Sequence, residues 1–178
     1  KSDISGVSAT IQNPSVDLPN GVTTKSAKIA ATSSGTGYLQ LHQWIDPQPY
    51  MDNRQITISA YVRSNNANTR IRVEKTGGNV DGSNTHSGGG GWELLEETIT
   101  LPDSLSSFRI GVIMWNGNAV SISNGDYIEM AEFKAEFGSR RTPFEHEPYE
   151  TTLRKCQRYF YTVKGPSNGK HKIGRAHV

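Results

Sequence analysis

The feature that most constrains the fold is an alternation of apolar and polar residues with a period of two, which recurs along the chain as far as Phe137. It is clearest in Gln55–Ser64, where the apolar residues Ile56, Ile58 and Val62 are two and four positions apart. Successive side chains of a β-strand point to opposite faces, so this pattern places one apolar row against a core and the other row toward solvent. The alternation therefore predicts a domain built from strands.

Turn-forming residues separate the alternating segments, for example Asn20-Gly21, Asn116-Gly117 and Asn124-Gly125. Besides Gln55–Ser64, the predicted strands are Ser26–Ala31, Gly37–Ile45, Thr69–Lys75, Trp92–Leu101, Phe108–Trp115, Val120–Ile122 and Tyr127–Phe137. About eight short strands of this kind are typical of an antiparallel β-sandwich. A switch of phase in the last strand predicts a bulge near Ala131 or Glu132. No internal repeat is evident, which disfavours a propeller, a solenoid or a β-helix.

Size and composition limit the function. A chain of 178 residues fits one domain with an appendage. The net charge of +2 and scattered basic residues give no argument for nucleic-acid binding, and no apolar run approaches the roughly 20 residues that span a membrane.

A single cysteine, Cys156, rules out an intrachain disulfide and favours assembly in a reducing cytoplasm over secretion. The chain starts at Lys1 without a signal peptide or Met, so we expect it to be a fragment.

The pattern changes after residue 137. Pro143 and Pro148 interrupt the strand pattern, since proline has no backbone N–H for a sheet hydrogen bond. From Glu150 the apolar residues, such as Leu153 and Phe160, have helical spacing. We therefore predict a short C-terminal α-helix within residues 146–163.

The run TPFEHEPYETTLRKCQRYF (Thr142–Phe160), preceded by EFGS (Glu136–Ser139), resembles a segment of bacteriophage tail-fibre and other phage structural proteins. That family has Leu-Glu-x-Gly, then Thr-Pro-Phe-Glu, a short helix and Cys-Gln-Arg-Tyr-Tyr. A weaker resemblance continues upstream through Gly37–Ile45, Gln55–Asn65 and Trp92–Pro102. It implies a jelly-roll β-sandwich, similar to carbohydrate-binding modules, that is carried on virion tails. Here Glu150 stands where a Gly is common, and Phe137 replaces a smaller residue.

The expected organisation follows. Residues 1–145 form the jelly roll, residues 146–163 the helix that links to a missing C-terminal domain, and residues 164–178 an unstructured tail. The last seven residues, KIGRAHV (Lys172–Val178), match the translation of a common sequencing adapter, and we interpret them as adapter read-through. The alternative is a natural basic tail.

Candidate carbohydrate-binding residues are aromatic and amide side chains, because rings stack on the C–H faces of sugars while amides and imidazoles bind their hydroxyls. One face of Gly37–Ile45 carries four of them, and two more lie in the loop Asp46–Arg54 and at the end of Phe108–Trp115. The candidates are Tyr38, Gln40, His42, Trp44, Tyr50 and Trp115. The alternative is that these rings pack under a neighbouring loop.

Catalytic and metal-binding patterns are weak. The acids that could form a glycosidase pair, Glu93, Glu96, Glu97, Glu129 and Glu132, occupy ordinary outward strand positions, and no Gly-x-Ser-x-Gly or His-Glu-x-x-His motif occurs. We expect no enzyme activity and no cofactor; a structural Ca²⁺ is not derivable from the sequence. Thr76–Gly91 is expected to be a long mobile loop whose Asp81, Asn84 and His86 are more often solvated than metal-bound.

A basic cluster lies near the expected helix. The cluster forms a solvated face, makes ion pairs with Glu145, Glu147 and Glu150, or contacts another subunit. Its members are Arg140, Arg141, Arg154, Lys155 and Arg158. Tail fibres are commonly trimeric, so the resemblance favours a homotrimer in which Arg154, Arg158, Tyr159 and Phe160 contact a neighbouring protomer or domain.

The sequence therefore favours a non-enzymatic tail-fibre or virion protein whose jelly roll binds a host-surface glycan or acts as an adaptor. The alternative is a carbohydrate-binding module of a secreted bacterial glycoside hydrolase, which would have the same fold. A third possibility is a structural virion spacer without a ligand.

Overall fold

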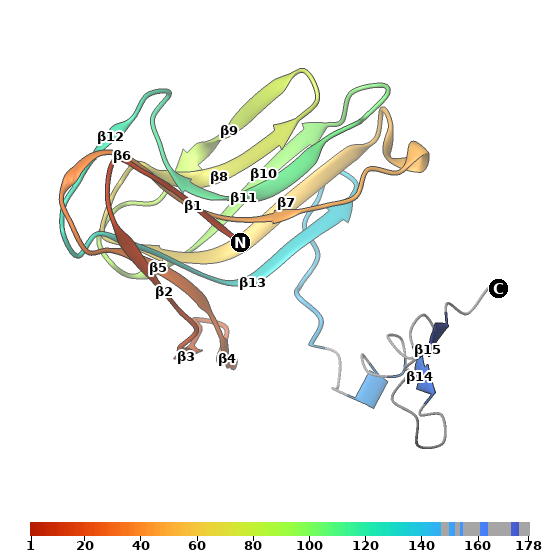
Figure 1. Cartoon of the computed structure of the whole chain (residues 1–178), viewed down its shortest axis with the longest axis horizontal. Coiled ribbons are helices and arrows are strands. Elements are labelled where there is room, and N and C mark those ends of the chain that lie inside the picture. The colour runs from red at the N-terminus through yellow and green to blue at the C-terminus, as the bar shows by residue number, and fades with distance from the viewer. Residues whose placement is uncertain (147–149, 152–153, 155–160, 164–171, 175–178) are drawn as a thin grey trace. The chain divides into compact units, whose positions relative to one another are not determined.

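The computed structural model describes residues 1–146, 150–151, 154, 161–163 and 172–174. Its contacts divide the chain into two compact units, Lys1–Thr142 and Pro143–Val178. The first unit is an all-β sandwich of two antiparallel sheets (Figure 1). Among the described residues there is no helix with the length and apolar character needed to cross a membrane.

The first sheet supplies the candidate site. Its strands, in spatial order, are β1 (Ser2–Ser5), β6 (Gly35–Trp44), β11 (Phe108–Met114), β8 (Thr69–Lys75) and β9 (Gly78–Thr85). Strand β12 (Val120–Ile122) pairs with the first residues of β6. All these pairings are antiparallel.

The second sheet lies on the other side of the core. Its strands, in spatial order, are β10 (Trp92–Thr100), β7 (Gln55–Ser64), β13 (Tyr127–Phe137), β5 (Ala27–Ala31) and β2 (Ala9–Gln12). The short strands β3 (Ser15–Asp17) and β4 (Thr23–Lys25) pair with each other in the connection between β2 and β5 (Figure 1). A single turn of 3₁₀ helix, η1 (Pro49–Met51), precedes β7.

The predicted alternation is confirmed by burial. Ile58 and Val62 of β7 are fully buried, as are Leu39 of β6 and Val112 of β11, and all belong to one hydrophobic core between the sheets. Burial of a Leu, Ile or Val side chain contributes about 1.5–3 kcal/mol, so these rows account for why the two sheets face each other.

The predicted bulge is also confirmed. The register of β13 against β7 shifts between Ala131 and Lys134, and Glu132 has a φ of 48°. One extra residue on β13 moves its side chains to the other face, which explains the switch of phase in the sequence.

The first unit has thirteen strands rather than the expected eight. Short strands rich in Ser, Thr and Asn, such as β3 and β4, carry too few apolar residues for the alternation to show. The expectation of a long mobile loop at Thr76–Gly91 was wrong, because β9 occupies half of this range. Gly and Asn are poor strand formers, and here pairing with β8 outweighs their propensity.

In the second unit, β14 (Tyr161–Val163) pairs with β15 (Lys172–Gly174). The helix predicted within residues 146–163 falls mostly outside the described residues. In the part of that range that the structure describes there is no complete helix, and its last three residues form β14. Residues 172–174, expected in an unstructured tail, form β15.

Candidate functional site

The outer face of the first sheet, turned away from the core, carries most of the candidate residues. The register aligns its side chains in rows that cross the strands. One row contains Trp44, Arg109 and Glu74; the next contains His42, Gly111, Arg72 and Asp81; the third contains Asp3, Gln40, Ile113, Arg70 and Thr85. Tyr38 and Trp115, just past the end of β11, form a fourth row. We call these four rows the outer face.

Aromatic rings stand at both ends of the outer face. At one end Tyr38 and Trp115 meet edge to face, with ring centroids 6.1 Å apart. At the other end Trp44 is 52% exposed, and the Arg109 guanidinium lies 4.9 Å from its ring centroid. The rows between the rings are mainly polar and charged. An exposed ring beside polar groups gives both a stacking surface and hydrogen-bond partners.

Ion pairs fix the charged side chains of the outer face. Arg109 binds Asp3 of β1 and Glu74 of β8, and Glu74 also accepts a 2.7 Å hydrogen bond from Gln40 Nε2. Arg72 donates to both carboxylate oxygens of Asp81, at 2.7 and 3.3 Å. These bonds tie side chains from all five strands of the β1-β6-β11-β8-β9 order into a rigid arrangement, which lowers the entropic cost of binding a ligand.

His42 lies below the surface of this network. The residue is 3% exposed, and its Nδ1 is buried without a hydrogen-bond partner among the described residues, 3.9 Å from an Asp3 oxygen. Burial, followed by the positive charge of Arg109, lowers the pKa of His42 below its ordinary value, although Asp3 opposes the shift. The imidazole is therefore neutral at neutral pH.

A glycine, Gly111, lies at the centre of the outer face, where β11 and β6 approach closely. A Cβ at Gly111 would lie 2.2 Å from the backbone oxygen of Leu41 and 2.9 Å from the Cβ of His42. Any side chain there would push β11 away from β6. Gly111 therefore permits the close approach of the two central strands.

Five of the six residues predicted from sequence, Tyr38, Gln40, His42, Trp44 and Trp115, share the outer face. Gln40 and His42 are nearly buried, at 1% and 3% exposure, so Trp44 and the ring pair at the opposite end are the more accessible of the five. Their binding role stays a prediction. Packing of rings, the alternative interpretation, applies to Tyr38 in part, since this ring is only partly exposed beside Trp115.

Tyr50 does not belong to this group. It lies on η1, is 63% exposed, and meets Phe137 of the second sheet edge to face at 6.0 Å. Arg54 also lies over the Phe137 ring, at 4.1 Å. The sequence did not show that its loop runs to the other sheet.

The charged residues of β8 and β11 were missed as site residues. Arg70, Arg72, Glu74 and Arg109 alternate with the buried residues of their strands, so the period-two pattern already placed them on the outward face. Only the strand order shows that this face also carries Trp44 and Tyr38, because β6 and β8 are separated by β11.

A cavity of about 500 Å³ lies at the open edge of the sandwich, beside the outer face. Ile11, Ala27, Met130 and Phe133 line one side of it, and the last residues of β6 line the other. Its wall is mainly apolar. The cavity therefore offers fewer hydrogen-bond partners for a sugar than the outer face does.

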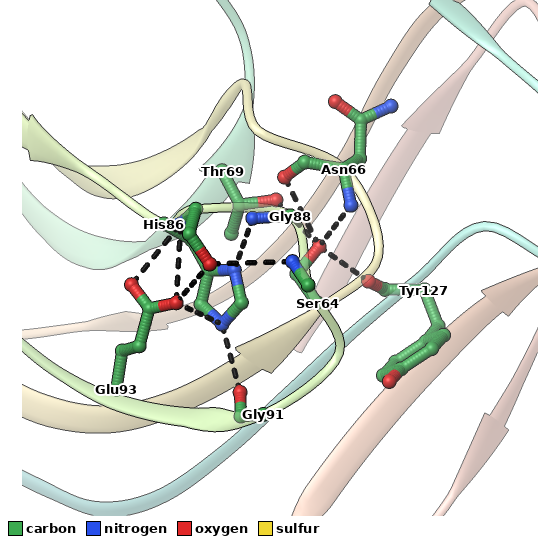
Figure 2. A network of polar contacts seen from close by, with 10 residues as sticks. Ser64, Asn66, Thr69, His86, Gly88, Gly91, Glu93 and Tyr127 are labelled. Carbon is green, nitrogen blue, oxygen red and sulfur yellow. Dashed lines mark hydrogen bonds and ion pairs between the residues drawn. The ribbon is translucent and has the colours of Figure 1, made fainter.

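His86 closes the glycine-rich segment after β9 through contacts with Gly88 and Gly91 (Figure 2). The His86 side chain is fully buried. Its Nδ1 accepts a hydrogen bond from Gly88 N at 2.9 Å, and its Nε2 lies 2.9 Å from Gly91 O. Glu93 accepts hydrogen bonds from Ser87. Burial by itself would raise the pKa of Glu93, but the hydrogen bonds from Ser87 stabilise the ionised carboxylate and hold the pKa below its ordinary value.

The metal interpretation of this segment is not supported. Both ring nitrogens of His86 are engaged within the loop, and Asp81 is paired with Arg72 on the outer face. In the part of the chain that the structure describes, no group of three or more His, Cys, Asp or Glu side chains is arranged to hold a metal ion.

The predicted oligomer contacts stay untested. Arg158, Tyr159 and Phe160 lie outside the described residues, and Arg154 is described only as exposed. Of the other cluster members, Arg141 lies 3.5 Å from a carboxylate oxygen of Glu96 on β10, a residue outside the expected partners.

No protein-family model matches the chain, and no curated protein matches it by sequence. Among solved structures, the enzymatically active domain of tailspike protein 4 of bacteriophage CBA120 gives a TM-score of 0.53 at 13% identity, over 77% of this chain and 19% of that chain. An exo-β-agarase gives 0.52 at 11% identity, over 97% of this chain and 34% of that one. The carbohydrate-binding module CBM4 gives 0.48 at 17% identity, over 75% and 81%.

The chain therefore spans about a fifth of the tailspike chain and about a third of the agarase chain. At these identities the two similarities with a TM-score above 0.5 show a shared β-sandwich fold.

Proposed function

We propose that the first unit is a non-enzymatic glycan-binding domain that holds a saccharide on the outer face of the β1-β6-β11-β8-β9 sheet. The observation that carries the proposal is the arrangement of that face. Aromatic rings at its two ends flank rows of polar side chains that ion pairs hold in place. Rings stack on sugar C–H surfaces and fixed polar groups select hydroxyls, as expected for a saccharide site.

The fold supports this role without identifying its context. A β-sandwich hosts many functions, so the argument rests on the site. The tailspike and the agarase are both much longer than this chain, so the similarity to them concerns the fold.

We propose the phage context on the resemblance of Thr142–Phe160 to tail-fibre proteins. The domain would then be a jelly roll on a virion tail that binds host-surface glycan, as part of a homotrimer. Several weak sites on one fibre would raise the overall avidity. A module of a secreted glycoside hydrolase is the alternative. The neighbouring genes discriminate the two, since tail genes favour the first and a catalytic domain in the same reading frame favours the second.

The non-enzymatic role is supported by the carboxylates that might have formed a glycosidase pair. Each has a structural partner: Ser87 for Glu93, Arg141 for Glu96, Ser83 for Glu97, Arg63 for Glu129 and Asn20 for Glu132. Side chains committed to such bonds are poorly placed to act as an acid and a base.

A glycan array with the purified protein tests the proposal, followed by calorimetry on the strongest hits. Trp44→Ala and Trp115→Ala should each weaken binding by about tenfold or more, since each removes a stacking ring. Trp92→Ala is the matched control, because Trp92 lies on β10 of the other sheet. Absence of binding to every glycan, or equal binding by all three variants, would leave only a scaffold role. Release of reducing sugar from any hit would contradict the non-enzymatic assignment.

A further inference from the structure

Arg70 has no counter-ion on the outer face. Its Nε is buried without a hydrogen-bond partner, and its guanidinium forms no ion pair or hydrogen bond with the residues that the structure describes. The Nε of Arg109 is buried and unpaired in the same way, but the terminal nitrogens of Arg109 bind two carboxylates, whereas Arg70 has no carboxylate partner among the described residues. An unpaired guanidinium on a candidate binding face therefore points to a ligand.

The charges of the face show why Arg70 is left over. Three carboxylates and three guanidinium groups are present, but they do not pair one to one. Arg109 binds both Asp3 and Glu74, and Arg72 binds Asp81. All three carboxylates are thus engaged, and the third guanidinium has no anion within the described residues.

The neighbours of Arg70 do not supply one. The residues directly opposite it are Ile113 on β11 and Thr85 on β9. Two residues along β8 lies Arg72, whose charge is balanced by Asp81 and whose guanidinium is 4.9 Å from the Trp115 ring. The residues beside Arg70 therefore leave its own charge uncompensated, which favours an added negative group.

We propose that the glycan bound on the outer face is acidic, and that Arg70 binds its carboxylate or sulfate group. The inference rests on the proposed glycan-binding function and specifies the class of saccharide. The planar guanidinium presents two parallel N–H groups to a carboxylate or sulfate, which favours a bidentate contact. Trp115, in the next row, is placed to stack on the ring that carries the acidic group.

The test compares one acidic saccharide with its neutral counterpart. Oligogalacturonate and the same oligomer with its carboxylates reduced to alcohols are titrated into the protein by calorimetry, with a heparin-derived oligosaccharide as the sulfated probe. We expect at least one acidic probe to bind at least tenfold more tightly than the neutral oligomer. That advantage should decrease as salt is raised from about 0.05 to 0.5 M, because salt screens charge pairs.

Arg70→Gln should remove the advantage of the acidic probe over the neutral oligomer, while Arg70→Lys should retain part of that advantage. The control is Arg140→Gln, which removes the same charge at an exposed position after β13. Equal affinity for acidic and neutral oligomers, with Trp115→Ala still weakening both, overturns this inference and leaves the proposed function intact. Failure of all the probes, together with an empty glycan array, overturns both.

Discussion

The buried carboxylate of Glu129 on the second sheet gives the sharpest prediction about stability. Its side chain is fully buried and accepts hydrogen bonds from Arg63 at 2.6 and 3.1 Å and from Ser26 Oγ at 2.6 Å. Removing one partner of a buried ion pair costs about 3–5 kcal/mol, because the other charge is left uncompensated. Arg63→Leu is the perturbation that exposes this cost.

The structure places the expected value at the low end of that range. Arg63 is one-third exposed, at 33%, so water reaches part of the site, and Ser26 continues to donate to the carboxylate. We expect Arg63→Leu to lower the free energy of unfolding by about 3 kcal/mol. For a chain of this size the corresponding fall in Tm is about 6–12 °C.

Urea denaturation followed by fluorescence measures the change, with the slope compared between variants to confirm that both unfold in the same way. The double variant Arg63→Leu/Glu129→Leu should recover most of the loss, since replacing both partners of a buried pair by apolar residues is often neutral. The glycan binding proposed for the outer face should be unchanged, because both residues lie on the second sheet. A loss below about 1 kcal/mol for Arg63→Leu, or a double variant less stable than the single one, would refute the argument.

Three further predictions concern the first sheet and the loop after β9. The pKa of His42 is lower in the folded protein than in the unfolded chain, so on acidification the unfolded chain takes up this proton at a higher pH than the folded protein does. The free energy of unfolding should therefore decrease as pH falls below about 6.5. His42→Gln should flatten this part of the pH profile, measured by urea denaturation. His86→Ala leaves the partners of a buried side chain unpaired, so it should cost about 2–3 kcal/mol and speed amide exchange in the loop up to Gly91; unchanged exchange there would contradict the loop-closing role. Gly111→Ala should destabilise the protein by about 2–3 kcal/mol, because its Cβ would lie against a backbone oxygen of β6, whereas Gly89→Ala, whose nearest neighbour would be a side-chain oxygen at 3.4 Å, should be close to neutral in the same thermal unfolding assay.

Much of the candidate site could be predicted from the sequence, because its residues occupy alternate positions of one strand and therefore share one face. Tyr38, Gln40, His42 and Trp44 were assigned to one face of one strand, and the structure places them on one face of β6. Their exposure was not predictable in the same way. Gln40 and His42 are nearly buried because long side chains of neighbouring strands surround them, and the order of those strands depends on pairing between distant segments.

The sequence alone determined the fold class, the main strands, the inward rows of the core and the bulge in β13, because each depends on the local period of two and on its interruption. Tertiary structure decided what sequence spacing does not encode: that β11 lies between β6 and β8, that β9 forms from Gly and Asn residues, that Tyr50 lies near the second sheet, and that Arg70 is left without a counter-ion. These features depend on which strands become neighbours. Strand pairing depends on burial of the whole core, which is a property of the assembled sheets, and the charges of the outer face become neighbours only once the strands are paired.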